Sequence, residues 1–171
     1  VSVHVDEPMM AGRQVKARFD EMRPHMRLKE TKILQSGQSI EHLGRSYTRL
    51  DEETFKTGPA KGYIEDTLEL WGMEKCNLAP TPGANKTENE KKLDQVKLNP
   101  ERHWQYRQAV GRLQFLVEDR NDIGYAVKEL ARDLTEPSEG SLLRLKRLCS
   151  YLKGTADLGM LIRLKGVPTK L

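Results

Sequence analysis

Two adjacent carboxylates, Asp6 and Glu7, carry the most specific chemistry near the start of the chain. They follow the alternating apolar segment 1–5 and precede the apolar segment 9–11, a pattern that predicts strand, acidic turn, strand. Carboxylates at a hairpin tip can hold Mg²⁺, which prefers oxygen ligands, and two such ions stabilise the attacking and leaving oxygens of nucleotidyl transfer. A polar turn without any ligand explains the same residues, because acidic residues are common at turns.

Four basic side chains lie on a predicted helix near the C-terminus, opposite a face of leucines: Arg144, Lys146, Arg147 and Lys153. Arg144 and Arg147 are three residues apart and therefore lie on neighbouring turns. These side chains can grip the phosphate backbone of a nucleic-acid duplex. An ordinary solvated helix face explains them as well.

Three tyrosines, Tyr106, Tyr125 and Tyr151, each adjoin an apolar helical face, so we expect them to pack in the core and not to stack on bases. The histidines show no metal-ligand spacing. Cys76 and Cys149 are far apart in the sequence, which predicts neither a disulfide framework nor a metal knuckle and fits a reducing, intracellular compartment.

The composition fits one domain, or one domain with an appendage. The chain has 171 residues, 32% charged and 37% hydrophobic, and lacks an apolar run long enough to cross a bilayer, so no membrane partner is expected. Its net charge is +4, and the whole excess lies in residues 101–171, which hold 13 Lys and Arg against 9 Asp and Glu. This distribution is compatible with contact to phosphates or with a solvated surface.

Further periodicities predict the elements that position these residues. After the hairpin of residues 1–12 we expect a helix over 14–28 that Pro24 kinks or divides, then a hairpin over 39–56 and a helix over 63–71. The polar segment 79–100 predicts a mobile linker. Three helices follow it, and a strand is predicted to begin at Gly159.

The order and spacing of several motifs resemble the C-terminal part of the reverse transcriptase of copia-type LTR retrotransposons. The motifs are HVDE (4–7) with MMAG (9–12), LGR (43–45), YI (63–64), WGM (71–73), TPG (81–83), YRQAVGRL (106–113), DRNDIGYAV (119–127) and LCSYLKGT (148–155). Together they span almost the whole chain.

This resemblance implies an α+β fold in which the β-hairpins at the end of a polymerase palm are followed by a mostly helical thumb. The implied parts are a palm end with a catalytic-type and a primer-grip-like hairpin (1–58), a first thumb helix (59–78), the mobile linker (79–100), the helical thumb (101–156) and the start of a connection to a ribonuclease H domain (157–171).

The resemblance also implies the site. Asp6 and Glu7 are the implied catalytic residues and Mg²⁺ ligands, and nucleic acid is expected at Leu43, Gly44 and Arg45 as well as at the four basic residues. The implied partners are an RNA template, the RNA/DNA primer–template duplex and the rest of the Pol polyprotein. The implied location is intracellular, either cytoplasmic within a virus-like particle or nuclear.

Several residues depart from the family pattern at the catalytic-type hairpin: His4 replaces a tyrosine, Glu7 replaces an aspartate, and Pro8 stands where an apolar strand residue is expected. The upstream palm aspartate of the family is not in this sequence. We therefore expect a reverse transcriptase fragment that is inactive as an isolated chain. The alternative is a non-catalytic nucleic-acid-binding or interaction remnant, domesticated or pseudogenic.

Overall fold

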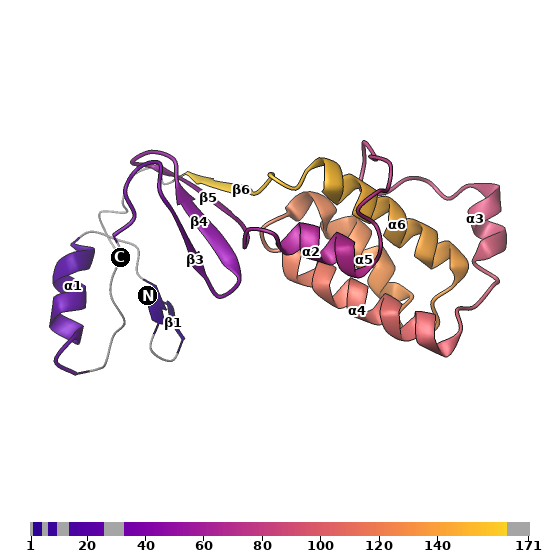
Figure 1. Ribbon diagram of the computed structural model, residues 1–171, viewed down its shortest axis with the longest axis horizontal. Helices are drawn as coiled ribbons and strands as arrows, with labels where there is room; N and C mark the ends of the chain where they lie inside the picture. Colours follow the sequence, from indigo (N-terminus) through magenta and orange to yellow (C-terminus); the bar gives the residue numbers. More distant parts are fainter. Residues whose placement is uncertain (1, 5–6, 10–13, 26–32, 164–171) are drawn as a thin grey trace, which may run out of the picture.

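A computed structural model describes residues 2–4, 7–9, 14–25 and 33–163, which form an elongated α+β structure (Figure 1). The elements are β1 (Ser2–His4), β2 (Glu7–Met9), α1 (Val15–Met22), β3 (Ser39–His42), β4 (Arg45–Arg49), β5 (Thr54–Pro59), α2 (Tyr63–Leu70), α3 (Glu88–Leu93), α4 (Pro100–Leu116), the 3₁₀ turn η1 (Asn121–Ile123), α5 (Gly124–Arg132), α6 (Glu139–Gly154) and β6 (Met160–Arg163). None of the described helices is both long and apolar enough to span a membrane.

The N-terminal hairpin is confirmed. Strands β1 and β2 pair antiparallel, with His4 opposite Glu7 and Val3 opposite Pro8. Strand pairing therefore continues through the proline on the returning strand. Asp6 lies outside the described residues, as does the side chain of Glu7. Helix α1 ends at Met22, before Pro24, as expected because proline has no N–H with which to continue the helical hydrogen bonds.

The central sheet is antiparallel, with the strand order β3-β4-β5-β6. The predicted second hairpin is present as β4 and β5, and a tighter turn at Leu43 and Gly44 joins β3 to β4. Both turn residues have positive φ, 50° and 75°, as in the two-residue turns whose twist matches that of paired strands. The predicted C-terminal strand is also present, and β6 returns to pair with β5.

Helices α2, α4, α5 and α6 enclose the hydrophobic core (Figure 1). The buried members of this cluster are Ile64, Leu68, Tyr106, Ala109, Val110, Leu113, Leu116, Ile123, Val127, Leu130, Leu145, Leu148, Cys149 and Leu152. The predicted helices are confirmed, and Tyr106 packs in the core with its hydroxyl donating to the Leu130 carbonyl at 2.8 Å. The prediction for Tyr125 was wrong: it is 76% exposed, because it lies two residues from Val127 and so points away from the buried face.

The polar segment 79–100 contains a helix where the sequence predicted a linker. Thr87 caps α3, and the Glu90 side chain accepts from the Thr87 amide, so both halves of a capping box are present. Beyond α3, Lys97 forms a β-bridge with Ser138. Hydrogen bonds therefore hold much of this segment against the start of α6.

Candidate nucleic-acid interface

The turn at Leu43, Gly44 and Arg45 directs one side chain to solvent and another toward the helices. Leu43 is 46% exposed, whereas Gly44 lies close to the helices, since a Cβ at this position would be 3.4 Å from Phe115 Cζ. Arg45 turns inward and donates to Asp119 and Glu118, each at 2.6 Å. Leu43 is therefore the member of the predicted triplet whose side chain faces solvent, and Arg45 anchors the sheet to the helices.

Arg45 also makes a cation–π contact with the helices. Its guanidinium lies 4.8 Å above the Phe115 ring, which in turn packs against the Tyr63 ring with the centroids 5.3 Å apart. The carboxylate of Asp119 is almost fully buried, at 3% exposed. Arg45 is thus the counter-charge for a carboxylate that water cannot reach.

Of the four basic residues on α6, Arg144 is fully engaged within the protein. Its guanidinium donates to Asp94 at 2.9 Å, to Asp133 at 2.7 Å and to Ser141. Although burial acts to raise the Asp94 pKa, the Lys86 and Arg144 cations hold that pKa below its ordinary value. Arg144 therefore joins the segment after α3 to the end of α5 and to α6.

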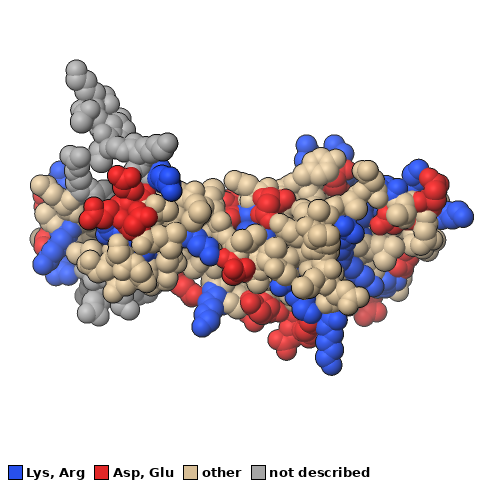
Figure 2. Space-filling model, turned by 90° about the horizontal axis from the view of Figure 1, so that it is seen from above, with Lys and Arg blue, Asp and Glu red and all other residues tan. Residues whose placement is uncertain are grey.

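The other three basic residues differ in their exposure. Arg147 donates to the Thr81 hydroxyl at 2.9 Å, and Lys153 donates to the Cys76 carbonyl at 2.8 Å. Lys146 is exposed and forms no ion pair or hydrogen bond within the described part of the chain. Figure 2 shows basic and acidic groups interspersed along the molecule, without one continuous basic field on this face.

Sequence reasoning missed a polar network around the buried Arg120 at the end of the helical unit. Arg120, 1% exposed, donates twice to Asp122 at 2.8 and 2.9 Å, and also to the carbonyl and hydroxyl of Thr155. Tyr151 donates to Asp122 at 2.7 Å. The Arg120 hydrogen bonds and the Tyr151 hydroxyl hold the Asp122 pKa below its ordinary value, against the effect of burial. These residues belong to the motifs 119–127 and 148–155, so the motifs were the available signal.

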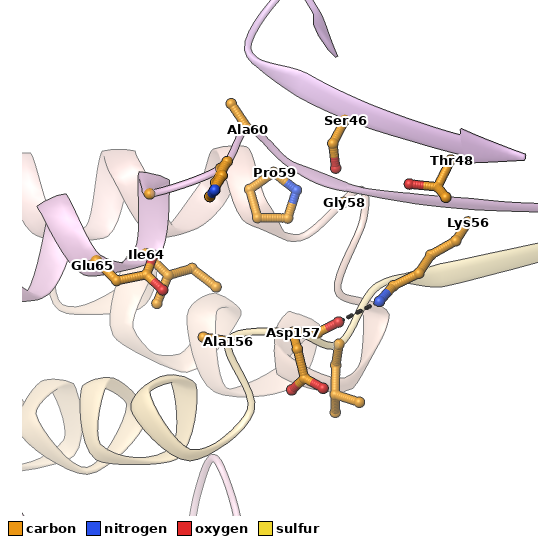
Figure 3. Close-up of a pocket in the computed structure, with 13 residues that line it drawn as sticks. Ser46, Thr48, Lys56, Gly58, Pro59, Ala60, Ile64, Glu65, Ala156 and Asp157 are labelled. Carbon is orange, nitrogen blue, oxygen red and sulfur yellow. Dashed lines mark hydrogen bonds between the residues drawn. The ribbon is translucent and has the colours of Figure 1, made fainter. Parts of the chain in front are cut away.

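A groove of about 300 Å³ lies where the sheet meets the helices (Figure 3). Ser46 and Thr48 of β4 contribute hydroxyls, and the first turn of α2 together with residues 156–158 forms the other sides. Lys56 reaches across and donates to the Asp157 carbonyl, as the dashed line in Figure 3 shows. Lys61 and Glu65 also line the groove, so its charge is mixed.

The predicted Mg²⁺ ligands cannot be placed, because Asp6 and the Glu7 side chain lie outside the described residues. Among the residues that the structure does describe, no three His, Cys, Asp or Glu side chains are arranged to hold a metal ion. Cys149 is buried, which raises the pKa of its thiol to about 12, so this thiol stays protonated at neutral pH. The Mg²⁺ site stays a prediction from the sequence.

The chain is similar to retrovirus-related Pol polyproteins from two transposons of Arabidopsis thaliana. It is 35% identical to that from transposon RE1 over 106 residues, which are 59% of this chain and 7% of the relative. It is 39% identical to that from transposon RE2 over 59 residues, 34% of this chain and 4% of the relative. The matched residues therefore cover less than a tenth of the length of either polyprotein.

A third relative is an uncharacterized mitochondrial protein of the same plant, 33% identical over 100 residues, which are 58% of this chain and 40% of that protein. No protein-family model matches the chain. No solved structure matches it either. The similarity thus points to retrotransposon Pol polyproteins as the group of relatives.

Proposed function

We propose that this chain is the end of the palm and the thumb of a reverse transcriptase from a retrotransposon Pol polyprotein. The similarity to the RE1 and RE2 Pol polyproteins carries the proposal. The motifs of the chain add the finer assignment: the hairpin with Asp6 corresponds to the catalytic-type turn, the strands β3 to β5 to the primer-grip-like region, and the later helices to the thumb. In the polyprotein this part works in RNA-directed DNA polymerisation.

Within that polymerase, we assign to this chain the role of holding the primer–template duplex. The exposed Leu43 at the β3–β4 turn and the exposed Lys146 on α6 are the predicted contacts that face solvent. A lysine in this setting acts as a point charge for a backbone phosphate. Arg45, Arg144, Arg147 and Lys153 then act chiefly as supports, because each is bonded within the chain.

Polymerisation by this chain alone is not expected. Asp6 and Glu7 would hold Mg²⁺, which activates the nucleophile and stabilises the leaving oxygen in nucleotidyl transfer. Two such ions need more carboxylates than one hairpin supplies, and the longer Glu7 side chain displaces its oxygens from the position of an aspartate.

Binding of a primer–template duplex tests the proposal. The affinity of the purified chain for an RNA/DNA duplex should fall steeply with salt, because neutralised phosphates release counterions. Lys146→Glu should weaken binding several-fold and reduce the salt slope by about one, as expected for a lost phosphate contact. Lys128→Glu, a change of an exposed lysine on α5, is the matched control. Absent or salt-insensitive binding of the duplex would contradict the proposed role in holding it.

A second candidate is a non-catalytic remnant that retains only binding or interaction. His4, Glu7 and Pro8 at the catalytic-type hairpin favour it, since Pro8 removes a backbone donor beside the carboxylates. Primer extension can exclude this second candidate: extension of a primed RNA template with Mg²⁺ that is abolished by Asp6→Asn would establish the polymerase. No extension by the isolated chain is the result expected of both candidates.

A further inference from the structure

Strand β6 leaves an apolar edge on the sheet. It is the last strand in the order β3-β4-β5-β6 and pairs only with β5 among the described strands. Leu161 is 64% exposed and Ile162 is 38% exposed. Because neighbouring residues of a strand point to opposite faces, apolar surface is exposed on both sides of this edge.

The opposite edge of the same sheet, formed by β3, is polar. Ser39 exchanges a hydrogen bond with Thr48 at 2.8 Å, and Glu41 accepts from the Lys61 amide at 3.0 Å. Native sheets commonly protect their edges with charged residues or by covering them, since unpaired backbone groups recruit other strands. Edge β3 fits this pattern with a charged residue in mid-strand, whereas the two middle positions of β6 are leucine and isoleucine.

The size of the edge indicates what covers it. A strand of four residues offers far less than the roughly 800 Å² per partner that a stable complex of separate proteins buries. A strand tethered to the same chain needs much less contact, since a short flexible linker gives an effective concentration in the millimolar range. The Pol polyproteins similar to this chain extend far beyond the matched region, which is 7% of RE1 and 4% of RE2.

We propose that β6 pairs with a further extended strand supplied by another part of the same polyprotein. The residues of β6 indicate the composition of the partner strand. It should carry apolar residues beside Leu161 and Ile162, and an acidic residue beside Arg163, which is exposed at the end of β6. This inference rests on the proposed origin in a Pol polyprotein. It adds a fifth strand to the sheet and covers the apolar edge.

Amide hydrogen exchange of a fusion protein tests this pairing. The full 171-residue chain is extended by a flexible Gly/Ser linker and the strand Thr-Val-Glu-Val-Val-Thr, which in antiparallel pairing can place its glutamate beside Arg163 and a valine beside each of Ile162 and Leu161. Exchange at these three residues is compared with that of a chain carrying the linker alone. We expect exchange in β6 to slow at least tenfold in the fusion. A strand with proline in place of its glutamate is the matched control and should give no slowing, because proline interrupts strand pairing.

Each outcome decides the proposal. Slowing at β6 that is lost in the double variant Leu161→Lys, Ile162→Lys supports it. Unchanged exchange, or slowing at β3 in its place, overturns it. Equal slowing by the same peptide added untethered at micromolar concentration, or self-association of the unextended chain, also overturns it by showing a separate partner. Exchange is measured without nucleic acid, so a failure here leaves the duplex-binding test of the proposed function unaffected.

Discussion

The sheet β3–β6 and the helical unit α2–α6 are stabilised in different ways. Every buried residue of the hydrophobic cluster lies between Ile64 and Leu152, in the helical unit. The described sheet buries two threonines, Thr54 and Thr57, and no large apolar side chain. The helical unit therefore contains its own core, while the sheet relies on strand pairing and on contacts with its neighbour.

The contacts between the two regions are largely polar. Arg45 joins β4 to the buried Asp119, and Lys56 joins β5 to the Asp157 carbonyl. Charge-assisted bonds of this kind depend on geometry more than apolar packing does. Changes in the core should therefore affect the whole chain, and changes at the junction should affect the sheet first.

The largest expected effect comes from the core. Leu148→Ala removes a side chain that is 0% exposed and should lower the free energy of unfolding by about 2–5 kcal/mol, measured by urea denaturation followed by circular dichroism. Leu143→Ala on the same helix is the matched control, because Leu143 is 37% exposed. Equal losses in the two variants would contradict the placement of Leu148 in the core and of Leu143 at the surface of α6.

A smaller and more local effect is expected at the junction. Arg45→Met leaves the buried Asp119 carboxylate without its counter-charge, at a cost of about 1–3 kcal/mol. Amide exchange should quicken in β3, β4 and β5 and stay nearly unchanged in the middle of α4 and α6. Arg107→Met, on the exposed side of α4, should change neither region. Uniform quickening across the chain would show that the two regions unfold together.

Acid should lower the free energy of unfolding of the helical unit by less than the Arg45→Met change does. The carboxylates concerned, Asp122 and Asp94, are partly exposed to solvent. Hydrogen bonds from Arg120 lower the Asp122 pKa, and Lys86 with Arg144 lower that of Asp94 despite its burial. A carboxyl whose folded pKa is depressed stabilises the fold above its unfolded pKa, near 4, and this contribution is lost as the pH falls below it.

Urea midpoints between pH 3 and pH 7 measure this acid dependence. Asp122→Asn should flatten the pH profile. The control is Asp51→Asn in the sheet, where the Glu53 amide lowers the Asp51 pKa but the carboxylate stands in solvent. If Asp51→Asn changes the pH dependence of the urea midpoint more than Asp122→Asn does, then the sheet and not the helical unit is the more acid-sensitive region.

The smallest expected effect is an increase in the free energy of unfolding. Gly111 lies on the exposed side of α4, and a Cβ there would meet nothing within 4 Å, so Gly111→Ala should raise the free energy of unfolding by about 0.5–1 kcal/mol. Gly140→Ala should do the reverse, because its Cβ would overlap the Asp94 carboxylate and lie 3.0 Å from the Glu90 carbonyl. Thermal unfolding of both variants measures these changes.

Local patterns in the sequence predicted the local elements well. Apolar residues at helical spacing predicted α2, α4, α5 and α6, because one buried face decides a helix. The helix α3 was missed although Thr87 and Glu90 form a readable capping box, since few apolar residues accompany them. Tyr125 was misplaced because adjacency to an apolar face in sequence is not the same as lying on that face.

Contacts between distant residues were not predictable from these patterns. Arg45 and Asp119, or Arg144 and Asp94, are joined by the folded chain and not by any spacing in the sequence. The roles of Arg144 and Lys153 therefore looked open between solvated surface and nucleic-acid contact. The catalytic-type pair Asp6 and Glu7 could be identified as candidates from their position at a predicted turn, and their ligand geometry stays a prediction.

The pairing of β5 with β6 has a consequence for how the chain folds. Thr57 and Met160 are partners across the sheet, yet the whole helical unit lies between them. Closing so long a loop in an unstructured chain costs entropy before any strand contact forms. The helical unit, with its more local contacts, should therefore form first and bring the two strands together. The helices are in effect an insertion within a β-hairpin, and the last strand to join the sheet is the one whose outer edge is unpaired among the described strands.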